Sequence, residues 1–267
     1  MAKKTSKNIK IGITGSTGVL GSILTKKLRQ KKYNISVFQS DICDFLKVRD
    51  WIKNHNFDAI FHLASLVPVK LCNDDPLKAC SINIGGTNNI LNSIKSLDKK
   101  PWLFYASTSH VYKLKKTPLS ETDNISPRTF YGYTKLMGEI LLENTHLSNN
   151  INYCIGRIFS FYSDAQSEEF LYSSIRKKLK KNLNKKNIFI FNANNVLDIQ
   201  KAESVVKIII KLFEKKAQST FNIGTGKGVE IKSFVKKLAK KKITILTNTK
   251  KKTIVVANIK KLNSVIL

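Results

Sequence analysis

The chain has 267 residues, of which 42% are hydrophobic, and 47 basic against 18 acidic side chains give a formal net charge of +29. This length is enough for one large α/β domain or for a domain with a small lobe, and the apolar content supports a globular core. No apolar run is long enough to span a membrane, and the start MAKKTSKNIK lacks the apolar stretch of a signal peptide, so we expect a soluble, cytoplasmic protein.

The positive charge comes almost entirely from lysine. Only five of the basic residues are Arg, which is the side chain that proteins use most to recognise the bases of nucleic acids. The lysines are spread along the chain. We therefore expect nonspecific attraction to polyanions rather than recognition of nucleic acid. The four cysteines and four histidines are scattered without a C-x-x-C pair, so neither a disulfide framework nor a metal site is expected.

The first motif is a glycine-rich turn between a strand and a helix. Residues Ile9 to Thr14 predict a buried strand, which runs into GSTGVLG at 15–21 and an amphipathic helix up to Tyr33. In this context Gly15 allows a tight turn, Gly18 lets backbone approach a pyrophosphate, and Gly21 lets the helix pack on the strand. A dinucleotide site is the favoured interpretation, and a tight turn without a ligand is the alternative.

The end of the second strand bears on the choice of cofactor. Residues 35–38 predict this strand, and Gln39 and Ser40 follow it where NAD-specific sites often carry an acid. Both NADP and NAD therefore stay open. Asp41 either caps the next helix or contacts the adenine end of a dinucleotide, whereas Asp44 is better explained as a helix cap.

The third strand, residues 58–62, is followed by Ala64 and Ser65, two small residues expected against the cofactor. His62 is better explained as part of the core than as a ligand. A long helix is expected to begin near 74–76 and to include Asn83. Because asparagine is unfavourable inside a helix, a buried hydrogen-bonding role is predicted for it.

The most informative stretch runs from 102 to 139. A buried strand ends in Ser107-Thr108-Ser109, and a later helix carries Tyr131 and Lys135, which share one face because they lie four residues apart. An ammonium beside a phenol favours the phenolate, so the Tyr131 pKa is expected to fall below its usual value of ~10. Tyr-x-x-x-Lys alone is also typical of a half-buried aromatic beside a solvated lysine.

The rest of the chain continues the alternation of strands and helices. It predicts a doubly wound, mainly parallel sheet in one domain over 1–267, with a dinucleotide-binding core at about 8–160. Residues 161–267 are expected to be mixed and to contribute a small C-terminal substrate-binding lobe. The expected elements are strands at 152–160, 188–191, 219–223, 243–247 and 253–257 and helices at 170–175, 203–213 and 231–238. The last two strands are expected to close the sheet, and no helix is expected after them.

Seven segments together resemble the extended short-chain dehydrogenase/reductase family, in its NAD-dependent epimerase/dehydratase group. They are TGSTGVLG at 14–21, DICD at 41–44, HLAS at 62–65, NIGGTNNIL at 83–91, STSHVY at 107–112, YGYTK at 131–135 and FNIGTGKGVEI at 221–231. Within the group, the short path from the second strand to DICD and the segment PLSETDNISPRTFYGYTKLMGE look most like dTDP-4-dehydrorhamnose reductases. The resemblance implies a Rossmann-type fold, NADP or NAD as cofactor, a nucleotide-sugar substrate and a homodimer.

The resemblance also implies roles for individual residues. Tyr131 would be the general acid/base, Lys135 would lower its pKa and hold the nicotinamide ribose, and Thr108 would bind the reacting sugar oxygen. The implied cofactor-binding residues are Gly15, Ser16, Thr17, Gly18, Val19, Leu20, Gly21, Asp41, Ile42, Leu63, Ala64, Ser65, Asn83, Ser107, Tyr131 and Lys135. The implied substrate-binding residues are Val67, Ser109, His110, Arg157 and Ser160.

Some positions depart from the family pattern. Ser109-His110 replace an acid and an aromatic residue, Ser160 replaces an asparagine, and Leu197-Asp198 lack the arginine that many members place near the substrate diphosphate. The expected function is reduction of a 4-keto-6-deoxysugar nucleotide. The alternatives are a 4-epimerase or dehydratase that retains its dinucleotide, a non-catalytic dinucleotide-binding subunit, and polyanion binding by the lysine surface.

Overall fold

The structure is a computed structural model that describes residues 8–183, 186–239, 243–248 and 252–267. Its centre is a six-stranded sheet in the order β10-β5-β4-β3-β1-β2, in which every neighbouring pair is parallel. The strands are β1 (Lys10–Thr14), β2 (Asn34–Val37), β3 (Ala59–His62), β4 (Trp102–Thr108), β5 (Tyr153–Ile158) and β10 (Ser219–Ile223).

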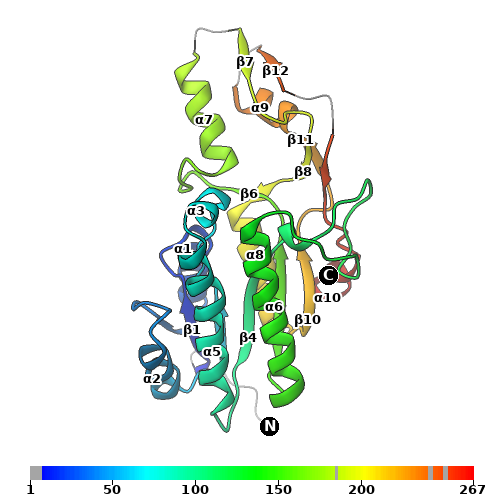
Figure 1. The fold of residues 1–267 in the computed structure, drawn as a ribbon. Helices are drawn as coiled ribbons and strands as arrows, with labels where there is room; N and C mark the ends of the chain where they lie inside the picture. The colour runs from blue at the N-terminus through cyan, green and yellow to red at the C-terminus, as the bar shows by residue number, and fades with distance from the viewer. Residues whose placement is uncertain (1–7, 184–185, 240–242, 249–251) are drawn as a thin grey trace.

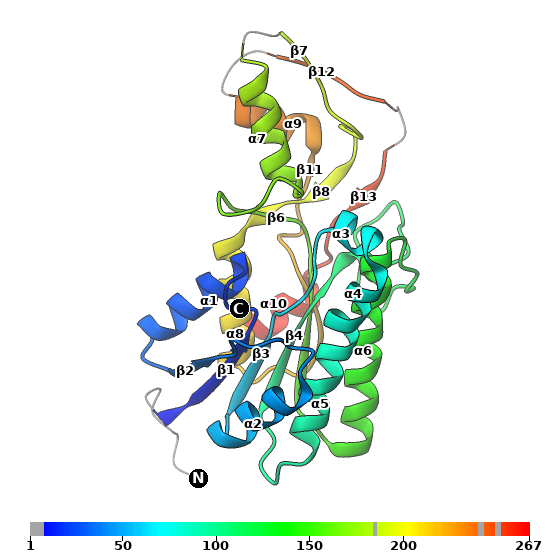
Figure 2. The same cartoon turned by 60° about the vertical axis from the view of Figure 1, so that its left-hand side comes forward.

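Helices cover both faces of this sheet, as Figure 2 shows. One face is covered by α1 (Val19–Gln30), α8 (Ala202–Glu214) and α10 (Lys260–Ile266), and the other by α2 (Phe45–His55), α5 (Gly86–Lys95) and α6 (Phe130–Asn149). A parallel sheet buried on both faces needs strands that are apolar on both sides, and WLFYA of β4 is such a run. The predicted doubly wound α/β fold is therefore confirmed.

A smaller lobe lies beyond the carboxyl ends of the main strands, at the top of Figure 1. It consists of α7 (Leu171–Lys181), α9 (Ile231–Ala239), a three-stranded sheet β11-β8-β13 and a pair β12-β7, around its own apolar cluster. Its strands are β7 (Asn187–Phe189), β8 (Val196–Asp198), β11 (Gly228–Glu230), β12 (Thr244–Leu246) and β13 (Ile254–Val255). The pair β6 (Phe161–Tyr162) and β9 (Gln200–Lys201) joins the lobe to the main body.

Three local predictions differ from the structure. The helix expected from 74 onward is divided into α4 (Pro76–Cys80), a π-helical turn (Ser81–Gly85) and α5, preceded by α3 (Val69–Asp74). The last two predicted strands pair within the lobe instead of closing the main sheet. The unexpected α10 buries Leu262 against the main core. This helix has only seven residues, which are too few for hydrophobic periodicity to reveal it.

The length and apolar character of the helices show whether any of them could cross a membrane. Across the part of the chain that the structure describes, no helix combines the length and the apolar character required to cross a membrane.

His62 is a core residue, as predicted. On β3 it is hydrogen-bonded on both ring nitrogens, with Nδ1 2.7 Å from Thr14 Oγ1 and Nε2 3.0 Å from Thr87 Oγ1. Thr87 already donates its proton to the Asn83 carbonyl at 2.6 Å, so it accepts from the His62 Nε2–H group, and Nδ1 accepts from Thr14. This chain of bonds requires a neutral ring and connects β1, β3 and α5.

We predict that His62 contributes to acid sensitivity. Burial lowers the pKa of the His62 ring from 6.5 to about 3, with the charge of Lys135 as a second cause. Between these values the unfolded chain binds a proton that the folded chain refuses, so the free energy of unfolding falls as the pH falls, by up to ~1.4 kcal/mol per pH unit. Denaturant titrations between pH 6.5 and 4 should give a smaller slope in His62→Gln than in the wild type; equal slopes would contradict this assignment.

Candidate functional site

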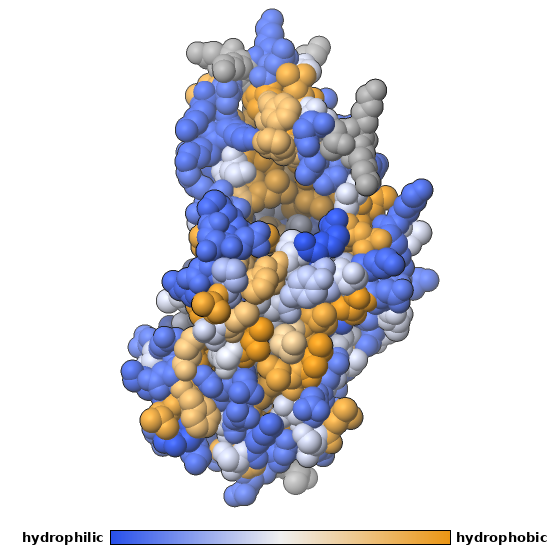
Figure 3. All heavy atoms as spheres, in the orientation of Figure 1, coloured by the Kyte–Doolittle hydropathy of each residue, from blue (hydrophilic) through white to orange (hydrophobic). Residues whose placement is uncertain are grey.

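A cavity of about 830 Å³ opens at the carboxyl ends of the main strands, below the lobe. Figure 3 shows the surface hollowed between the lobe and the main body. The strand order reverses between β1 and β3, which is where open α/β sheets form a crevice. The predicted site residues that line the cavity are Gly15, Thr17, Gly18, Val19, Leu20, Gly21, Leu63, Ala64, Ser65, Val67, Ser107, Thr108, Ser109, His110, Tyr131, Lys135 and Ser160.

The glycine turn forms one end of the cavity. Gly15 has φ +71°, and a Cβ there would lie 2.5 Å from the Ala64 nitrogen, while a Cβ on Gly21 would lie 2.1 Å from the Gly15 oxygen. These contacts confirm the predicted tight turn and close packing. At Gly18 a Cβ would meet only the Gly15 oxygen, at 3.4 Å, so the glycine leaves open space before the start of α1. No side chain caps α1, and its first N–H groups can bind an anion.

The other reactive residues lie where β4 ends and α6 begins. Thr129 caps α6 by accepting a hydrogen bond from the Gly132 nitrogen at 3.0 Å, and this start places Tyr131 and Lys135 in the first two turns. Thr108, the last residue of β4, lies close enough to the Tyr131 phenol for its hydroxyl to lower the pKa of that phenol. The Lys135 ammonium lies 4.2 Å from the centre of the Tyr105 ring. Thr108, Tyr131 and Lys135 therefore form one group inside the cavity.

The predicted lowering of the Tyr131 pKa is wrong. Burial raises the pKa of the Tyr131 phenol above its usual range, and the hydrogen bond from Thr108 offsets this only in part. Burial also lowers the pKa of Lys135 to about 7, against the attraction of Glu139. The sequence expectation treated Lys135 as a solvated cation, but a cation without hydration is itself unstable and titrates near neutrality.

Asn83 has the buried hydrogen-bonding role that its position in a helix predicts. Its Oδ1 accepts from the Ser65 hydroxyl at 2.8 Å and from the Leu66 nitrogen at 2.7 Å, and its Nδ2 donates to the Leu66 carbonyl and to Thr134 Oγ1. It does not line the cavity. Its bonds hold the segment after β3 against α6, and a direct contact with a cofactor stays a prediction.

Arg157 also lies outside the cavity, beneath it. Its guanidinium pairs with the Glu139 carboxylate, with Nη2 2.7 Å from Oε2, and Nη1 donates to the Glu121 carbonyl at 3.2 Å. Ser107 donates a hydrogen bond to the same carboxylate. Glu139 is one turn after Lys135 on α6, so this group ties β4, β5 and α6 together. All the donors of Arg157 used in these bonds are directed into the protein, away from the predicted substrate.

Asp41 and Ile42 are held by the protein beside the sheet edge. Asp41 accepts from the Cys43 nitrogen at 2.9 Å, and buried Ile42 packs on α5, where Asn89 donates to its carbonyl at 3.0 Å. Asp44 caps α2 through the Lys47 nitrogen at 3.1 Å, as predicted. Ser16 faces a neighbouring groove instead of the main cavity.

The sequence did not reveal that aromatic side chains of the lobe form one wall of the cavity. Tyr162 of β6, Tyr172 of α7 and Phe234 of α9 line the cavity as one aromatic cluster, with ring centres 5.1 Å and 5.6 Å from Tyr162. They lie far apart in the sequence and share no motif. Only the packing of the lobe brings them to one surface.

The family model for GDP-mannose 4,6 dehydratase matches residues 16–266 of the chain. UDP-glucuronate 4-epimerase 4 of Arabidopsis thaliana is 26% identical over 261 residues, which cover 84% of this chain but 58% of the relative's own length. The match to dTDP-4-dehydrorhamnose reductase of Mycolicibacterium smegmatis, 29% identical, extends over only 135 residues, 49% of this chain and 40% of that protein. The chain thus spans little more than half of the length of the Arabidopsis relative.

Solved structures agree on the fold. The UDP-glucose 4-epimerase of Thermus thermophilus, in complex with NAD, has a TM-score of 0.82 at 18% identity and covers 96% of this chain and 92% of its own. RMD from Pseudomonas aeruginosa, in complex with NADPH, has a TM-score of 0.86 at 19% identity, covering 98% and 92%. Both confirm the Rossmann-type α/β fold.

We predict that Lys135→Met stabilises the protein near neutral pH. Between pH 10.5 and about 7 the unfolded chain binds a proton at this lysine that the folded chain does not, so the wild type loses stability as the pH falls through this range. The variant should gain on the order of a few kcal/mol at pH 7, and this gain should shrink towards pH 10.5. Urea unfolding at several pH values measures it; a variant less stable than the wild type at pH 7 would contradict the assignment.

We also predict that Arg157→Met destabilises the fold by ~3–5 kcal/mol, because it leaves the Glu139 carboxylate buried without its cation. The double variant Arg157→Met/Glu139→Met should lose less than this single variant. Arg176→Met is the matched control, since its ion pair with Asp164 is exposed and should be worth at most ~1 kcal/mol. A double variant that is less stable than Arg157→Met would argue against a buried, coupled pair.

Proposed function

We propose a function from one premise: the chain belongs to the GDP-mannose 4,6-dehydratase family, a group of NAD(P)-dependent epimerases and dehydratases in the extended short-chain dehydrogenase/reductase class. The proposed activity is oxidation of a sugar hydroxyl in a nucleotide-activated sugar, followed by epimerisation or dehydration. The observation that carries it is the shared cavity that holds both the glycine turn and the group Thr108, Tyr131 and Lys135.

The residues of the cavity fall into two groups, one that would hold the cofactor and one that would hold the substrate. The turn from Gly15 to Gly21 and the free N–H groups of α1 would hold the pyrophosphate, with Ala64 and Ser65 beside it. A bound nicotinamide dinucleotide would accept a hydride from the sugar and return it. The lobe, with its aromatic cluster, would hold the remainder of the substrate.

Proton transfer is the task of Tyr131. Its raised pKa favours the phenol, which is the form that donates a proton to an oxygen as a carbonyl is reduced. In the opposite direction the phenolate takes the hydroxyl proton. Two neighbours stabilise that anion: Thr108 donates a hydrogen bond to it, and Lys135 is available as an ammonium below its pKa of about 7.

We favour an epimerase or dehydratase over the reductase that the sequence led us to expect. The family match and the epimerase relative extend over most of the chain, whereas the reductase match covers about half of it. An epimerase or dehydratase oxidises the sugar and later reduces its own intermediate, so it regenerates and can retain one dinucleotide, whereas a reductase exchanges it in every turnover. The homodimer implied by the resemblance and the cytoplasmic location expected from the sequence stay predictions, as do the regulatory and polyanion-binding alternatives.

His110 supports dehydration in particular. Its ring lines the cavity in a T-shaped contact with the Tyr131 ring, the centres being 5.8 Å apart. Although the residue is exposed, partial desolvation of the ring, followed by the charge of Arg128, lowers the His110 pKa, which keeps the imidazole neutral near neutral pH and able to accept a proton. Elimination of water from a sugar needs a second proton-transfer group beside the first, and epimerisation at one carbon does not.

We predict that Tyr131→Phe lowers turnover of the substrate by ~100- to 10,000-fold without releasing the dinucleotide, since it removes one hydroxyl from the cavity. UDP-glucuronate and GDP-mannose are suitable first substrates, with products separated by chromatography and bound dinucleotide measured after denaturation. Tyr133→Phe is the matched control, because Tyr133 is on the same helix and is 56% exposed. Full activity in Tyr131→Phe would rule out the proposed role of the phenol.

A further inference from the structure

Acidic residues are missing from most of the lobe, which concentrates the positive charge of the protein there. Segments 171–197 and 231–256, from which most elements of the lobe are built, contain seven and nine basic residues and no Asp or Glu. They make up about a fifth of the chain and contribute more than half of its formal net charge of +29. A surface of this kind attracts polyanions, and the groups beside the charges decide which polyanion it binds.

The end of the lobe farthest from the main body carries exposed apolar side chains. Figure 1 shows β7 and β12 at this end, with α7 beside them. In the parallel pair, Phe189 lies opposite Leu246, so both side chains are on one face, where they are 43% and 48% exposed. Phe191 is 63% exposed, and its ring centre is 5.0 Å from that of Phe189. Phe189, Phe191 and Leu246 together form what we call the apolar tip.

The apolar tip is not part of the core of the lobe. The opposite face of the same strands builds that core, since Ile188 and Ile190 are buried and Ile245 packs against their cluster. Figure 3 shows apolar residues at this end of the lobe, with hydrophilic residues on either side. A group of exposed aromatic and aliphatic side chains that contact one another is typical of a binding surface.

Lysines lie directly beside the apolar tip. The Lys178 ammonium is 5.5 Å from the centre of the Phe191 ring. Lys186 precedes β7, and its carbonyl accepts a hydrogen bond from the Thr244 nitrogen at 2.8 Å, at the start of the strand pair. Because neither segment contains an acidic residue, no acid close in the sequence neutralises these lysines. Charge and exposed apolar area therefore occupy the same end of the lobe.

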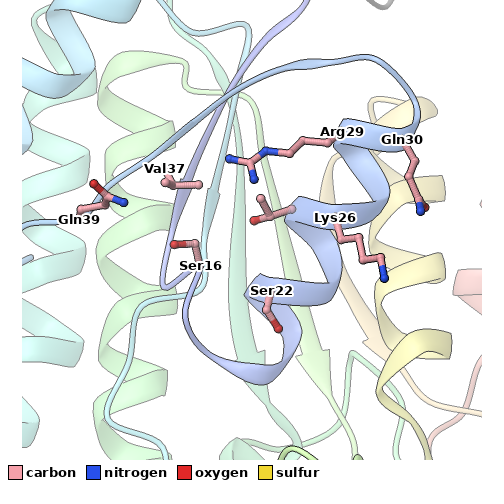
Figure 4. A pocket seen from close by; sticks show the side chains of 8 residues that line it. Ser16, Ser22, Lys26, Arg29, Gln30, Val37 and Gln39 are labelled. Atoms are coloured by element: carbon pink, nitrogen blue, oxygen red, sulfur yellow. The ribbon is translucent and has the colours of Figure 1, made fainter.

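The basic residues of α1 show what the apolar tip adds to charge. A hollow of about 540 Å³ between α1 and β2 is lined by Lys26, Arg29 and polar side chains, and Val37 is the single apolar residue among those described there (Figure 4). That surface provides charge without a cluster of exposed apolar side chains. The tip provides both, which is the combination that binds an anionic bilayer: apolar side chains enter the boundary of the acyl chains, and lysines contact the headgroups.

The tip suits nucleic acid less well than it suits a bilayer. Bases stack on the open face of an aromatic ring, but Phe189 and Phe191 form a T-shaped contact at 89°, in which the edge of one ring covers a face of the other. Leu246 has no flat face on which a base could stack. Arg176 is the single arginine of the two segments, and it pairs with Asp164.

We propose that the apolar tip and its lysines bind the surface of anionic lipid bilayers, with Phe189, Phe191 and Leu246 inserted below the headgroups. None of these three residues lines the cavity, which α7 contacts through Leu171 and Tyr172 at its start. A bilayer bound at the tip therefore does not occupy the cavity. The inference goes beyond the proposed function and does not depend on it.

Cosedimentation with vesicles tests the proposal. The wild type should bind vesicles that contain about 30% phosphatidylglycerol at least about tenfold more tightly than vesicles of phosphatidylcholine alone. Phe189→Ser/Phe191→Ser should weaken binding to the anionic vesicles by about tenfold or more, because it removes the inserted rings. The matched control is Phe45→Ser/Leu46→Ser, which removes two exposed apolar side chains from α2 in the main body and should bind as the wild type does.

A second pair of variants tests the lysines. Lys178→Gln/Lys186→Gln should weaken binding to the anionic vesicles by about three- to tenfold. Lys53→Gln/Lys95→Gln removes the same charge from exposed positions on α2 and α5 and should change binding by less than about twofold.

Insertion is measured by fluorescence. In Phe191→Trp, anionic vesicles should shift the emission of the introduced indole to the blue. The wild type should show no such shift, because Trp51 and Trp102 both lie in the main body. The thermal midpoint and the bound dinucleotide of Phe189→Ser/Phe191→Ser should be close to those of the wild type, since both rings are exposed and outside the cavity.

Three results would overturn the proposal. One is equal weakening by the tip variants and the main-body controls, which would leave only attraction by the net charge. Another is the absence of binding to anionic vesicles, or of a blue shift in Phe191→Trp. The third is tighter binding of a single-stranded oligonucleotide than of the vesicles, lost in Phe189→Ser/Phe191→Ser, which would assign the tip to nucleic acid.

Discussion

The ion pair between Glu139 and Arg157 is the contact on which the site depends. It lies buried below the cavity and joins α6 to β5, while Ser107 of β4 binds the same carboxylate. Tyr131, Lys135 and Glu139 follow one another at intervals of four residues, so the pair that fixes Glu139 also fixes the two residues nearer the cavity. Its charge is also the attraction that opposes the loss of the Lys135 proton.

Burial has two consequences for this row of residues. It raises the free energy of every charged form, which is why Tyr131 and Lys135 have pKa values displaced in opposite directions from their usual ones. It also makes those values sensitive to any further charge that enters the cavity, because little water screens it. A site of this kind changes the protonation of Tyr131 and Lys135 when an anionic ligand binds, whereas an exposed pair would respond weakly.

The net charge of +29 acts at longer range than these contacts. Dinucleotides and nucleotide sugars are polyanions, and a strongly positive protein attracts them from outside the contact distance, with an effect that salt reduces beyond ~8–10 Å. This attraction does not distinguish one anion from another. Discrimination needs groups in fixed positions, such as those that line the cavity.

The sequence by itself determined the alternation of strands and helices, the glycine turn, the roles of His62 and Asp44, and the family, because each depends on residues close together in the chain or on a motif. Tertiary structure alone decided the pKa values of Tyr131 and Lys135, the engagement of Arg157 with Glu139, and the aromatic wall of Tyr162, Tyr172 and Phe234. These depend on burial and on neighbours that are distant in the sequence. Hydration is lost only when the whole fold closes around a group, and no local pattern records that loss.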